Sequence, residues 1–430
     1  MIDWPSIILG CGLGLFAGLV PGLGPFTTLL LAFPLLLDMT ITQLLITYSA
    51  LITVSIYVGS VPATIYGIPG DSASMPVVYE SRNLKTLKQV SEAISGAASG
   101  GFFGSVVVAL FCLWMLDYLD NIKYFYSTPL FLALLIFASV VIICTSSSNK
   151  MVAFMLYSAG FILGLVGYNS HLDMPILVFN HYMYQGLPTE IVVSVLFALP
   201  NILFYWNYFS IGKNARQKED YSPWSMYIMN PIKSLFYTVI GFFTGLVPGL
   251  TTILSSVFSY NIMSTFTKDP VKRIVASETG NNAGAFSMLL PLLIFGLPIT
   301  SSEAMLLFFL EQSGFTVQLN ISTIIGVLIM NYMIINIIGV ALAWPLSNYV
   351  KYFYRLDLRY VFSMVLILIF GALLYSGWTS SSTMYYFGLT LLLIPFGAAL
   401  KNFDPLPLIF AFFISDRAVA AGFVVYQLYF

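Results

Sequence analysis

The stretch Gly18-Leu19-Val20-Pro21-Gly22-Leu23-Gly24-Pro25 interrupts an apolar run in which a helix would otherwise continue. Its two prolines and three glycines do not allow an unbroken helix. Lipid cannot hydrogen-bond the released N–H and C=O groups, so a break at membrane depth requires protein or a water-filled cavity to receive them. The same letters return in the second half as Gly245-Leu246-Val247-Pro248-Gly249-Leu250. Paired interruptions of this kind predict a transport site built from broken helices.

The composition is that of a polytopic membrane protein. Of 430 residues, 59% are hydrophobic and only 8% are charged, which is far from the balance of a soluble globule. The net charge of −1 gives no reason to expect a nucleic acid partner. Cys11, Cys112 and Cys144 stand singly in apolar runs and are read as packing residues. The first 25 residues contain no Lys or Arg, so we expect a retained membrane segment rather than a signal peptide.

Apolar runs that can cross or half-cross a hydrocarbon core of about 30 Å form two sets that match one to one. The first set is 5–37, 42–79, 89–116, 128–145, 151–170 and 190–209, and the second is 231–266, 274–310, 321–345, 359–376, 382–400 and 405–430. We therefore expect an all-α polytopic membrane protein with broken helices or re-entrant hairpins and about 12 membrane segments.

Basic residues in the short loops predict the orientation of these segments, because cytoplasmic loops carry an excess of Lys and Arg. The loop at 80–90 and the polar stretch at 213–220 are basic and are expected in the cytoplasm. The loops at 38–43 and 171–189 contain no Lys or Arg and are expected outside.

In the second half the loops have the opposite character. The loop at 266–273, which corresponds to 38–43, is basic, whereas the loop at 311–320, which corresponds to 80–90, contains no Lys or Arg. The two halves are therefore expected to be inverted-topology repeats, with both termini outside. The predicted division is a first repeat at 1–210, a cytoplasmic linker at 211–230 and a second repeat at 231–430.

A second pair of breaks follows the first in each half. It reads Gly67-Ile68-Pro69-Gly70-Asp71-Ser72-Ala73-Ser74 and Gly296-Leu297-Pro298-Ile299-Thr300-Ser301-Ser302-Glu303. Each helix stops at Gly-X-Pro, and a new one starts on residue types that cap helix N-termini. Thr300 and Glu303 have the spacing of a capping box. Two interpretations remain open. Either these side chains serve only as hydrogen-bond partners for the free backbone N–H groups at the helix starts, or the half-helix N-termini bind an anionic carboxylate without a basic residue.

Polar residues in the membrane segments gather at the breaks and form the candidate site. The predicted substrate-binding residues are Gly22, Thr27, Thr28, Gly70, Ser72, Ser74, Gly249, Thr251, Asn281, Asn282, Thr300 and Ser301. The predicted coupling-ion residues are Asp71, Glu278 and Glu303, with Na⁺ or H⁺ as the ion. We expect no catalytic residue, no metal site and no other cofactor.

Some of these residues have a second interpretation. Asn281 and Asn282 are candidates for substrate binding or for bonds between helices, since an unpartnered amide in lipid is costly. Glu278 and Glu303 need a partner, a proton or a cation, although Glu278 also lies close to the basic loop before it. Arg417 is expected to pair with another segment or a partner subunit and receives no transport role. Stripes such as Gly14, Gly18 and Gly22 are more readily explained by helix packing.

These motifs resemble the TctA-type large transmembrane subunit of the tripartite tricarboxylate transporters. The resemblance rests on the two Pro-Gly strings, on the break at 67–74, on Ala276-Ser277-Glu278-Thr279-Gly280-Asn281-Asn282-Ala283 running into the second break, and on Asp404-Pro405-Leu406-Pro407-Leu408. It covers nearly the whole chain. The second Pro-Gly string departs from the pattern at Thr251 and Thr252, and the break at 296–303 has Ile299 where a glycine is expected.

The resemblance implies an ion-driven uptake of a di- or tricarboxylate, such as citrate, across the inner membrane. It also implies a small membrane subunit and a periplasmic substrate-binding protein as partners, and leaves a homo-oligomer open. A stand-alone ion-coupled carrier and a passive organic-anion channel remain alternatives. An intramembrane enzyme is disfavoured, because convergent His, Cys or carboxylate groups are lacking in the sequence.

Overall fold

The structure is a computed structural model of the chain. It describes residues 2–20, 24–67, 72–116, 129–146, 148–169, 172–192, 226–247, 251–315, 321–353 and 383–429, together with isolated positions between these ranges. The predicted site residues Gly22, Gly70, Asp71 and Gly249 lie outside the described residues, as do most of the predicted segment 359–376 and the polar stretch 211–220.

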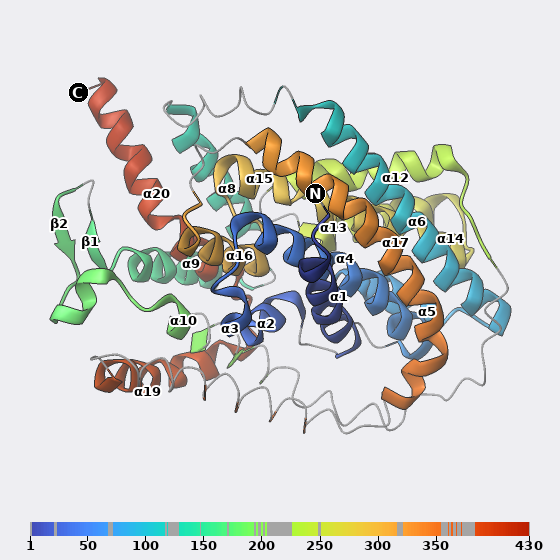
Figure 1. Cartoon of the computed structure of the whole chain (residues 1–430), viewed down its shortest axis with the longest axis horizontal. Coiled ribbons are helices and arrows are strands. Elements are labelled where there is room, and N and C mark those ends of the chain that lie inside the picture. The colour runs from blue at the N-terminus through green and yellow to red at the C-terminus, as the bar shows by residue number, and fades with distance from the viewer. Residues whose placement is uncertain are drawn as a thin grey trace.

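The described elements are almost all helices (Figure 1). In the first half they are α1 (Trp4–Leu19), α2 (Gly24–Leu31), α3 (Phe33–Leu36), α4 (Ile41–Tyr66), η1 (Ser72–Ser74), α5 (Met75–Ser81), α6 (Leu87–Trp114), α8 (Pro129–Thr145), α9 (Lys150–Gly164), β1 (Gly167–Asn169), β2 (Met174–Ile176), η3 (His181–Gln185) and α10 (Thr189–Val192). In the second half they are α12 (Pro231–Leu246), α13 (Thr251–Phe266), α14 (Pro270–Ser287), α15 (Leu289–Phe295), α16 (Ser301–Gln312), α17 (Ile321–Phe353), α19 (Thr383–Ala399), η6 (Leu400–Asn402) and α20 (Leu406–Tyr429).

Several of these helices can cross a membrane. Among the described residues, four helices are long and apolar enough, namely those with spans at Ile41–Ile65, Leu87–Trp114, Ser322–Trp344 and Leu406–Tyr429. Shorter apolar helices, including α1, α8, α9 and α12, accompany them. The protein is therefore an all-α multi-pass membrane protein, as expected. The number of about 12 segments and the inverted repeat stay predictions.

Both predicted Gly-X-Pro breaks end a helix in the same way. Gly67 follows α4 with φ of 65°, and Gly296 follows α15 with φ of 62°. This left-handed conformation costs glycine little and strains other residues, so each glycine stops its helix and turns the chain. The sequence placed both breaks correctly because the signal is local.

The two halves have the same order of elements. A helical pair, α1 with α2 or α12 with α13, precedes a longer helical stretch that ends at the left-handed glycine. A short helix, α5 or α16, and a long helix, α6 or α17, come next. The members of each pair contact one another, α1 with α2 and α12 with α13, which fits the predicted hairpins.

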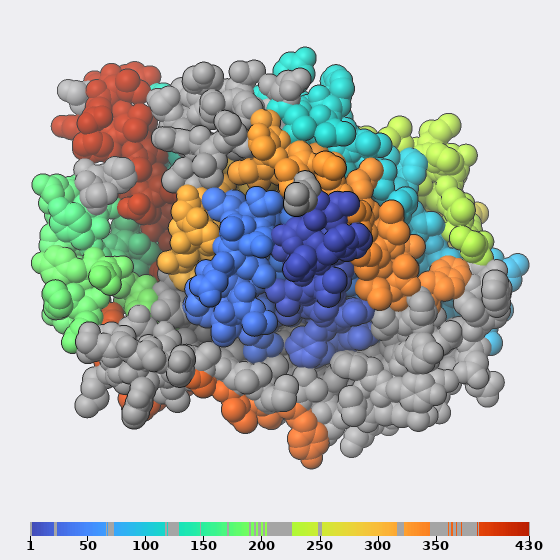
Figure 2. Space-filling model, in the orientation of Figure 1, coloured from blue at the N-terminus to red at the C-terminus, as the bar shows by residue number. Residues whose placement is uncertain are grey.

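The halves pack crosswise. Helix α6 of the first half lies on α14 of the second, and α17 of the second half lies on α4 of the first. The break elements follow the same rule, since η1 and α5 contact α13 and α14, whereas α16 contacts α2 and α4. Figure 2 shows this on one face, where the blue N-terminal helices lie between the gold and orange helices of the second half. Each break therefore lies against helices of the other half.

Close helix packing explains the glycine stripes. A Cβ added at Gly14 of α1 would lie 2.7 Å from the carbonyl oxygen of Leu51 in α4. A Cβ added at Gly241 of α12 would lie 2.3 Å from the carbonyl oxygen of Gly280 in α14. The packing interpretation of these glycines is therefore confirmed, because only glycine allows the two backbones to approach so closely.

This packing leads to a matched prediction on one helix. Gly14→Ala should destabilise the protein by about 1 to 3 kcal/mol, because the new methyl group would overlap α4. Gly12→Ala should be neutral or stabilise by up to about 1 kcal/mol, because the position is open, with no atom within 4 Å of an added Cβ. Thermal unfolding in detergent measures both. Equal unfolding midpoints for the two variants would contradict the close contact of α1 with α4.

Candidate functional site

The Gly-X-Pro break at 296–303, called the second break from here on, is held by the predicted capping box. Thr300 accepts a hydrogen bond from the backbone N–H of Glu303 through Oγ1, at 3.2 Å. In return, Oε2 of Glu303 accepts from the backbone N–H of Thr300 at 3.1 Å and from that of Ile299 at 2.7 Å. The capping role of Thr300 and Glu303 is therefore confirmed. Ser301 is the first residue of α16 and is partly exposed.

The other carboxylate oxygen of Glu303, Oε1, takes no part in the capping box. Glu303 is fully buried, and among the described residues its Oε1 has no hydrogen-bond partner. A buried carboxylate oxygen without a partner is costly unless a proton or a cation compensates it. This arrangement supports the coupling-ion interpretation, which stays a prediction.

Helices of the first half surround this break. Tyr48 of α4 is buried, and its hydroxyl donates to Oγ of Ser302 at 3.1 Å. Thr27 and Thr28 of α2 are both fully buried. Thr28 donates to the carbonyl of Gly24 in its own helix at 2.8 Å, whereas Oγ1 of Thr27 has no partner in the described part of the chain. Of the two predicted threonines, Thr27 is the one whose hydroxyl is not used within its helix.

The Gly-X-Pro break at 67–74, called the first break from here on, is fixed by a serine of the second half. Oγ of Ser256 in α13 donates to the carbonyl of Ala73 at 2.6 Å and lies 2.7 Å from Oγ of Ser277 in α14. Ser74 next to it is fully buried, and Ser72 begins η1. The serines of α13 and α14 were not predicted as site residues, because the sequence does not show which helix a break contacts.

Helix α14 carries the predicted acid and amides side by side. Glu278, Asn281 and Asn282 are all buried, with 1% exposure or less. Asn281 donates to Oε2 of Glu278 at 3.4 Å, and Asn282 donates to the backbone carbonyl of Glu278 at 2.9 Å. Glu278 lies well inside a buried helix, which disfavours the interpretation that it only sits near a segment end.

The amide oxygens of this group are buried. Within the described residues, neither Oδ1 of Asn281 nor Oδ1 of Asn282 has a hydrogen-bond partner. Asn282 lies at the interface with α6 and α4, since a Cβ added at Gly101 would lie 2.8 Å from Cγ of Asn282 and 3.0 Å from Cε1 of Tyr57. The bonds between helices that served as the alternative explanation are not made by these two oxygens.

The structure thus brings the predicted residues into two groups. Thr27, Thr300 and Glu303 gather around the second break, on α2 and α16 with α4 beside them. Ser74 lies in the first break, which contacts α13, whereas Glu278 and Asn281 lie on α14, which contacts α5 directly after that break. Thr251 begins α13. Each group joins a break of one half to helices of the other.

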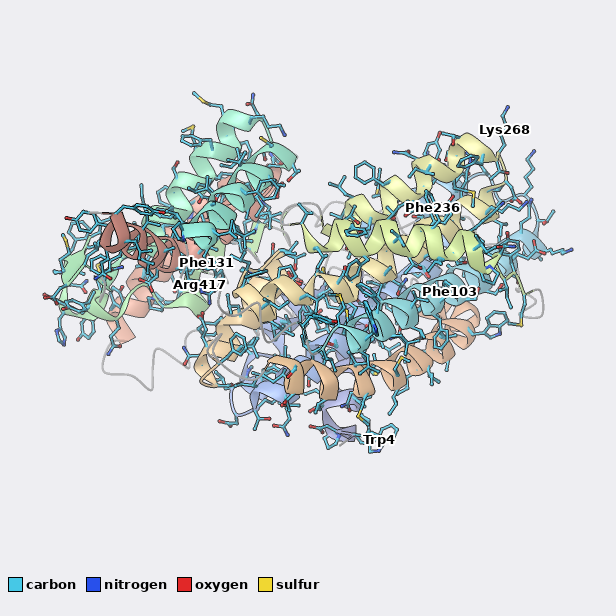
Figure 3. All side chains as sticks on the ribbon, turned by 90° about the horizontal axis from the view of Figure 1, so that it is seen from above. Trp4, Phe103, Phe131, Phe236, Lys268 and Arg417 are labelled. Atoms are coloured by element: carbon cyan, nitrogen blue, oxygen red, sulfur yellow. The ribbon has the colours of Figure 1, made fainter. Side chains whose placement is uncertain are left out.

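Arg417 of α20 contacts the second break directly. Its guanidinium donates to the carbonyl oxygen of Gly296 and forms an ion pair with Glu311 at the end of α16. Its pairing with another segment is therefore confirmed. Arg417 reaches this break because α20 packs against α16. In Figure 3 Arg417 and Phe131 of α8 appear in the same part of the view, and Lys268 lies at the opposite end of the molecule.

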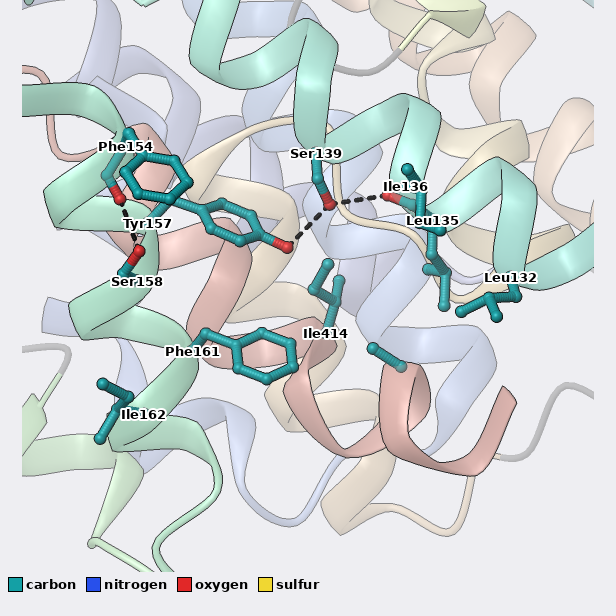
Figure 4. A pocket seen from close by; sticks show the side chains of 11 residues that line it. Leu132, Leu135, Ile136, Ser139, Phe154, Tyr157, Ser158, Phe161, Ile162 and Ile414 are labelled. Atoms are coloured by element: carbon teal, nitrogen blue, oxygen red, sulfur yellow. Dashed lines mark hydrogen bonds between the residues drawn. The ribbon is translucent and has the colours of Figure 1, made fainter. Parts of the chain in front are cut away.

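A groove between α8, α9 and α20 is unsuited to an anion (Figure 4). Its volume is about 400 Å³, and it is lined mainly by hydrocarbon and phenyl groups such as those of Leu132, Phe154 and Phe161. Ser139 and Tyr157 on its wall lie 2.8 Å apart and hydrogen-bond each other. Among the described residues, no group of three or more His, Cys, Asp or Glu side chains is arranged to hold a metal ion.

Comparison with known proteins agrees with the motifs. The model of the family described as "Tripartite tricarboxylate transporter TctA family" matches residues 6–409. A protein of Agrobacterium vitis described as "Uncharacterized 52.8 kDa protein in TAR-I ttuC' 3'region" is 23% identical over 309 residues. The match covers 67% of this chain and 60% of that relative, so the chain spans less than two thirds of its length. No solved structure matches the chain.

Proposed function

Because the chain belongs to the tripartite tricarboxylate transporter TctA family, we propose that it is the membrane subunit that imports small organic anions, di- or tricarboxylates such as citrate, across the inner membrane. The observation that carries this proposal is the pair of helix breaks, each enclosed by buried polar residues of the other half. Broken helices at a repeat interface are typical of the substrate sites of secondary transporters.

The second break supplies groups that can hold a carboxylate. The first N–H groups of a helix have no intrahelical acceptor, so those of Ser301 and Ser302 remain after the capping box has used its own donors. The helix dipole adds about half a positive charge at this end. Thr27 adds a short hydroxyl on this side, and the amides of α14 would act from the side of the first break. Such groups fix the orientation of a small anion rather than its net charge.

A cation must accompany the anion. A dianion or trianion is too costly to carry through lipid without compensation. We propose Glu303 and Glu278, together with Asp71, as the residues that take up Na⁺ or H⁺. The membrane potential is sufficient as a driving force, because moving one elementary charge across it contributes about 2.3 kcal/mol per 100 mV. The partners proposed are a small membrane subunit and a periplasmic substrate-binding protein that delivers the anion.

Uptake by proteoliposomes tests this function. We expect labelled citrate to accumulate when a Na⁺ or proton gradient and a cognate binding protein are present, and to stay near background without the gradient. Accumulation without the binding protein would favour a stand-alone carrier. Equilibration that is independent of any gradient would identify a passive channel and contradict the proposal.

A further inference from the structure

An ion pair with a buried carboxylate joins the two halves next to the first break. Glu80 at the end of α5 is fully buried. Its Oε1 accepts from Nη1 of Arg273 in α14 at 2.8 Å and from the hydroxyl of Tyr260 in α13 at 2.8 Å. Its Oε2 accepts from Nδ2 of Asn83 at 2.7 Å. Both oxygens are thus satisfied, which a buried carboxylate requires.

Arg273 is equally engaged. Its Nε donates to the carbonyl of Thr267 at 2.8 Å, and Nη2 donates to the carbonyl of Ser264 at 3.4 Å. These carbonyls belong to the C-terminal end of α13, where a cation also interacts favourably with the helix dipole. One guanidinium therefore ties α5 of the first half to the α13 and α14 pair of the second.

The ion pair and the first break lie along one seam. Ser256 and Tyr260 are four residues apart on α13, and Arg273 and Ser277 are four apart on α14, so each pair faces the same way. At one end of the seam Ser256 donates to the carbonyl of Ala73, and at the other Tyr260 and Arg273 bind Glu80. The segment from Ala73 to Glu80, called the first arm, is therefore held against the second half at both ends.

The corresponding place in the other repeat is apolar. Phe309 follows Gly296 at the same interval as Glu80 follows Gly67, and Leu44 follows the N-cap Thr40 as Arg273 follows the N-cap Asp269. Phe309 and Leu44 are both buried, and the ring of Phe309 lies 5.6 Å from that of Phe33. The fold thus closes one arm by an ion pair and the other by hydrocarbon and aromatic contacts.

We propose that Glu80 and Arg273 form the inner gate of the transporter, which closes the site toward the cytoplasm and separates when substrate is released there. The basic loops beside them, at 80–90 and 266–273, are predicted to be cytoplasmic, and Lys268 lies at one end of the molecule (Figure 3). The β1–β2 hairpin, whose loop is predicted outside, lies at the opposite end (Figure 1). The gate rests on the proposed function, and Glu80 and Arg273 act as positioning residues that need not touch the substrate.

Accessibility of a cysteine in the seam tests the gate without measuring transport. Ser256→Cys is introduced after Cys11, Cys112 and Cys144 have been replaced, and a membrane-impermeant maleimide is applied to inside-out vesicles. We expect Glu80→Arg and Arg273→Glu each to raise the labelling rate at least tenfold, and the double reversal to return it toward the parent rate. Phe309→Ala is the matched control and should leave labelling from this side unchanged.

Two further variants keep the test independent of folding. Glu80→Gln and Arg273→Lys keep most of the side-chain volume and should raise the labelling rate by a smaller factor than the reversals. They replace the charge reversals in the test if a reversal lowers the amount of protein in the membrane. Parent-like labelling in all single variants of normal abundance would overturn the gate, as would a raised rate that the double reversal leaves raised. Failure of citrate uptake by the parent protein would contradict the proposed function but not the gate, since labelling reports accessibility whatever the substrate.

Discussion

Glu303→Gln is expected to remove the ion dependence of uptake while the protein remains folded. Oε1 of Glu303 is buried without a partner in the described part of the chain, whereas Oε2 serves the capping box. Glutamine keeps one oxygen for the N–H groups of Ile299 and Thr300 but cannot take up a proton or neutralise a cation. We expect ion-driven uptake to fall at least about tenfold, equivalent to about 1.4 kcal/mol, and the remaining uptake to respond weakly to the gradient.

Comparing Glu303→Ala with Glu303→Gln separates the role of the charge from the role of the helix cap. Glu303→Ala removes both, so it should lose uptake and also stability, by about 0.5 to 2 kcal/mol for a lost cap. Uptake is measured at several Na⁺ concentrations and pH values, and stability by thermal unfolding in detergent. If Glu303→Gln keeps the ion response of the parent protein, Glu303 is only a helix cap and the coupling role is wrong.

Local chemistry explains which parts of the fold could be predicted. Gly67 and Gly296 end their helices because a left-handed residue followed by a Pro break leaves few alternatives. The capping box of Thr300 and Glu303 lies within four residues and was predicted from spacing alone. The class of the fold followed equally directly, because long apolar runs have few other uses.

Contacts between distant segments could not be predicted in this way. Glu80 and Arg273 were counted only as parts of loops, and no local pattern shows that they pair. Arg417 reaches Gly296 only because α20 returns to the second break. The β1–β2 hairpin at 167–176 was also missed, since its strands have three residues each and leave no readable alternation.

The candidate site shows the same division. Burial of Thr27, Asn281 and Glu303 agrees with their expected position at the breaks. The sequence predicted a single site made from four broken helices, and it did not show that each break lies against the opposite half. Ser256 and Ser277 complete the first group. Ser277 stands in the polar stretch before Asn281, but neither serine was predicted as a site residue, because serine is common in membrane helices and its role depends on its neighbour.

Asn281→Ala is expected to weaken substrate binding without destabilising the protein. Its amide oxygen has no partner among the described residues, and its Nδ2 makes only the 3.4 Å contact with Glu278 in the same helix. Little folding energy is therefore lost when the amide is removed, whereas a hydrogen bond to a charged ligand contributes about 1.5 to 3 kcal/mol. The half-saturation concentration for citrate should rise about tenfold or more.

Asn336→Ala is the matched control, because Asn336 is a buried amide whose groups are both used. Its Oδ1 accepts from the hydroxyl of Tyr57 at 2.9 Å, and its Nδ2 donates to the carbonyl of Tyr332 at 2.8 Å. Removing it leaves buried polar groups without partners and should lower the unfolding midpoint, by about 1 to 3 kcal/mol in stability, with a small effect on half-saturation. Citrate titration of uptake and thermal unfolding are measured for both variants. If Asn281→Ala behaves like Asn336→Ala, losing stability while half-saturation stays unchanged, then Asn281 stabilises the helix bundle and belongs outside the substrate site.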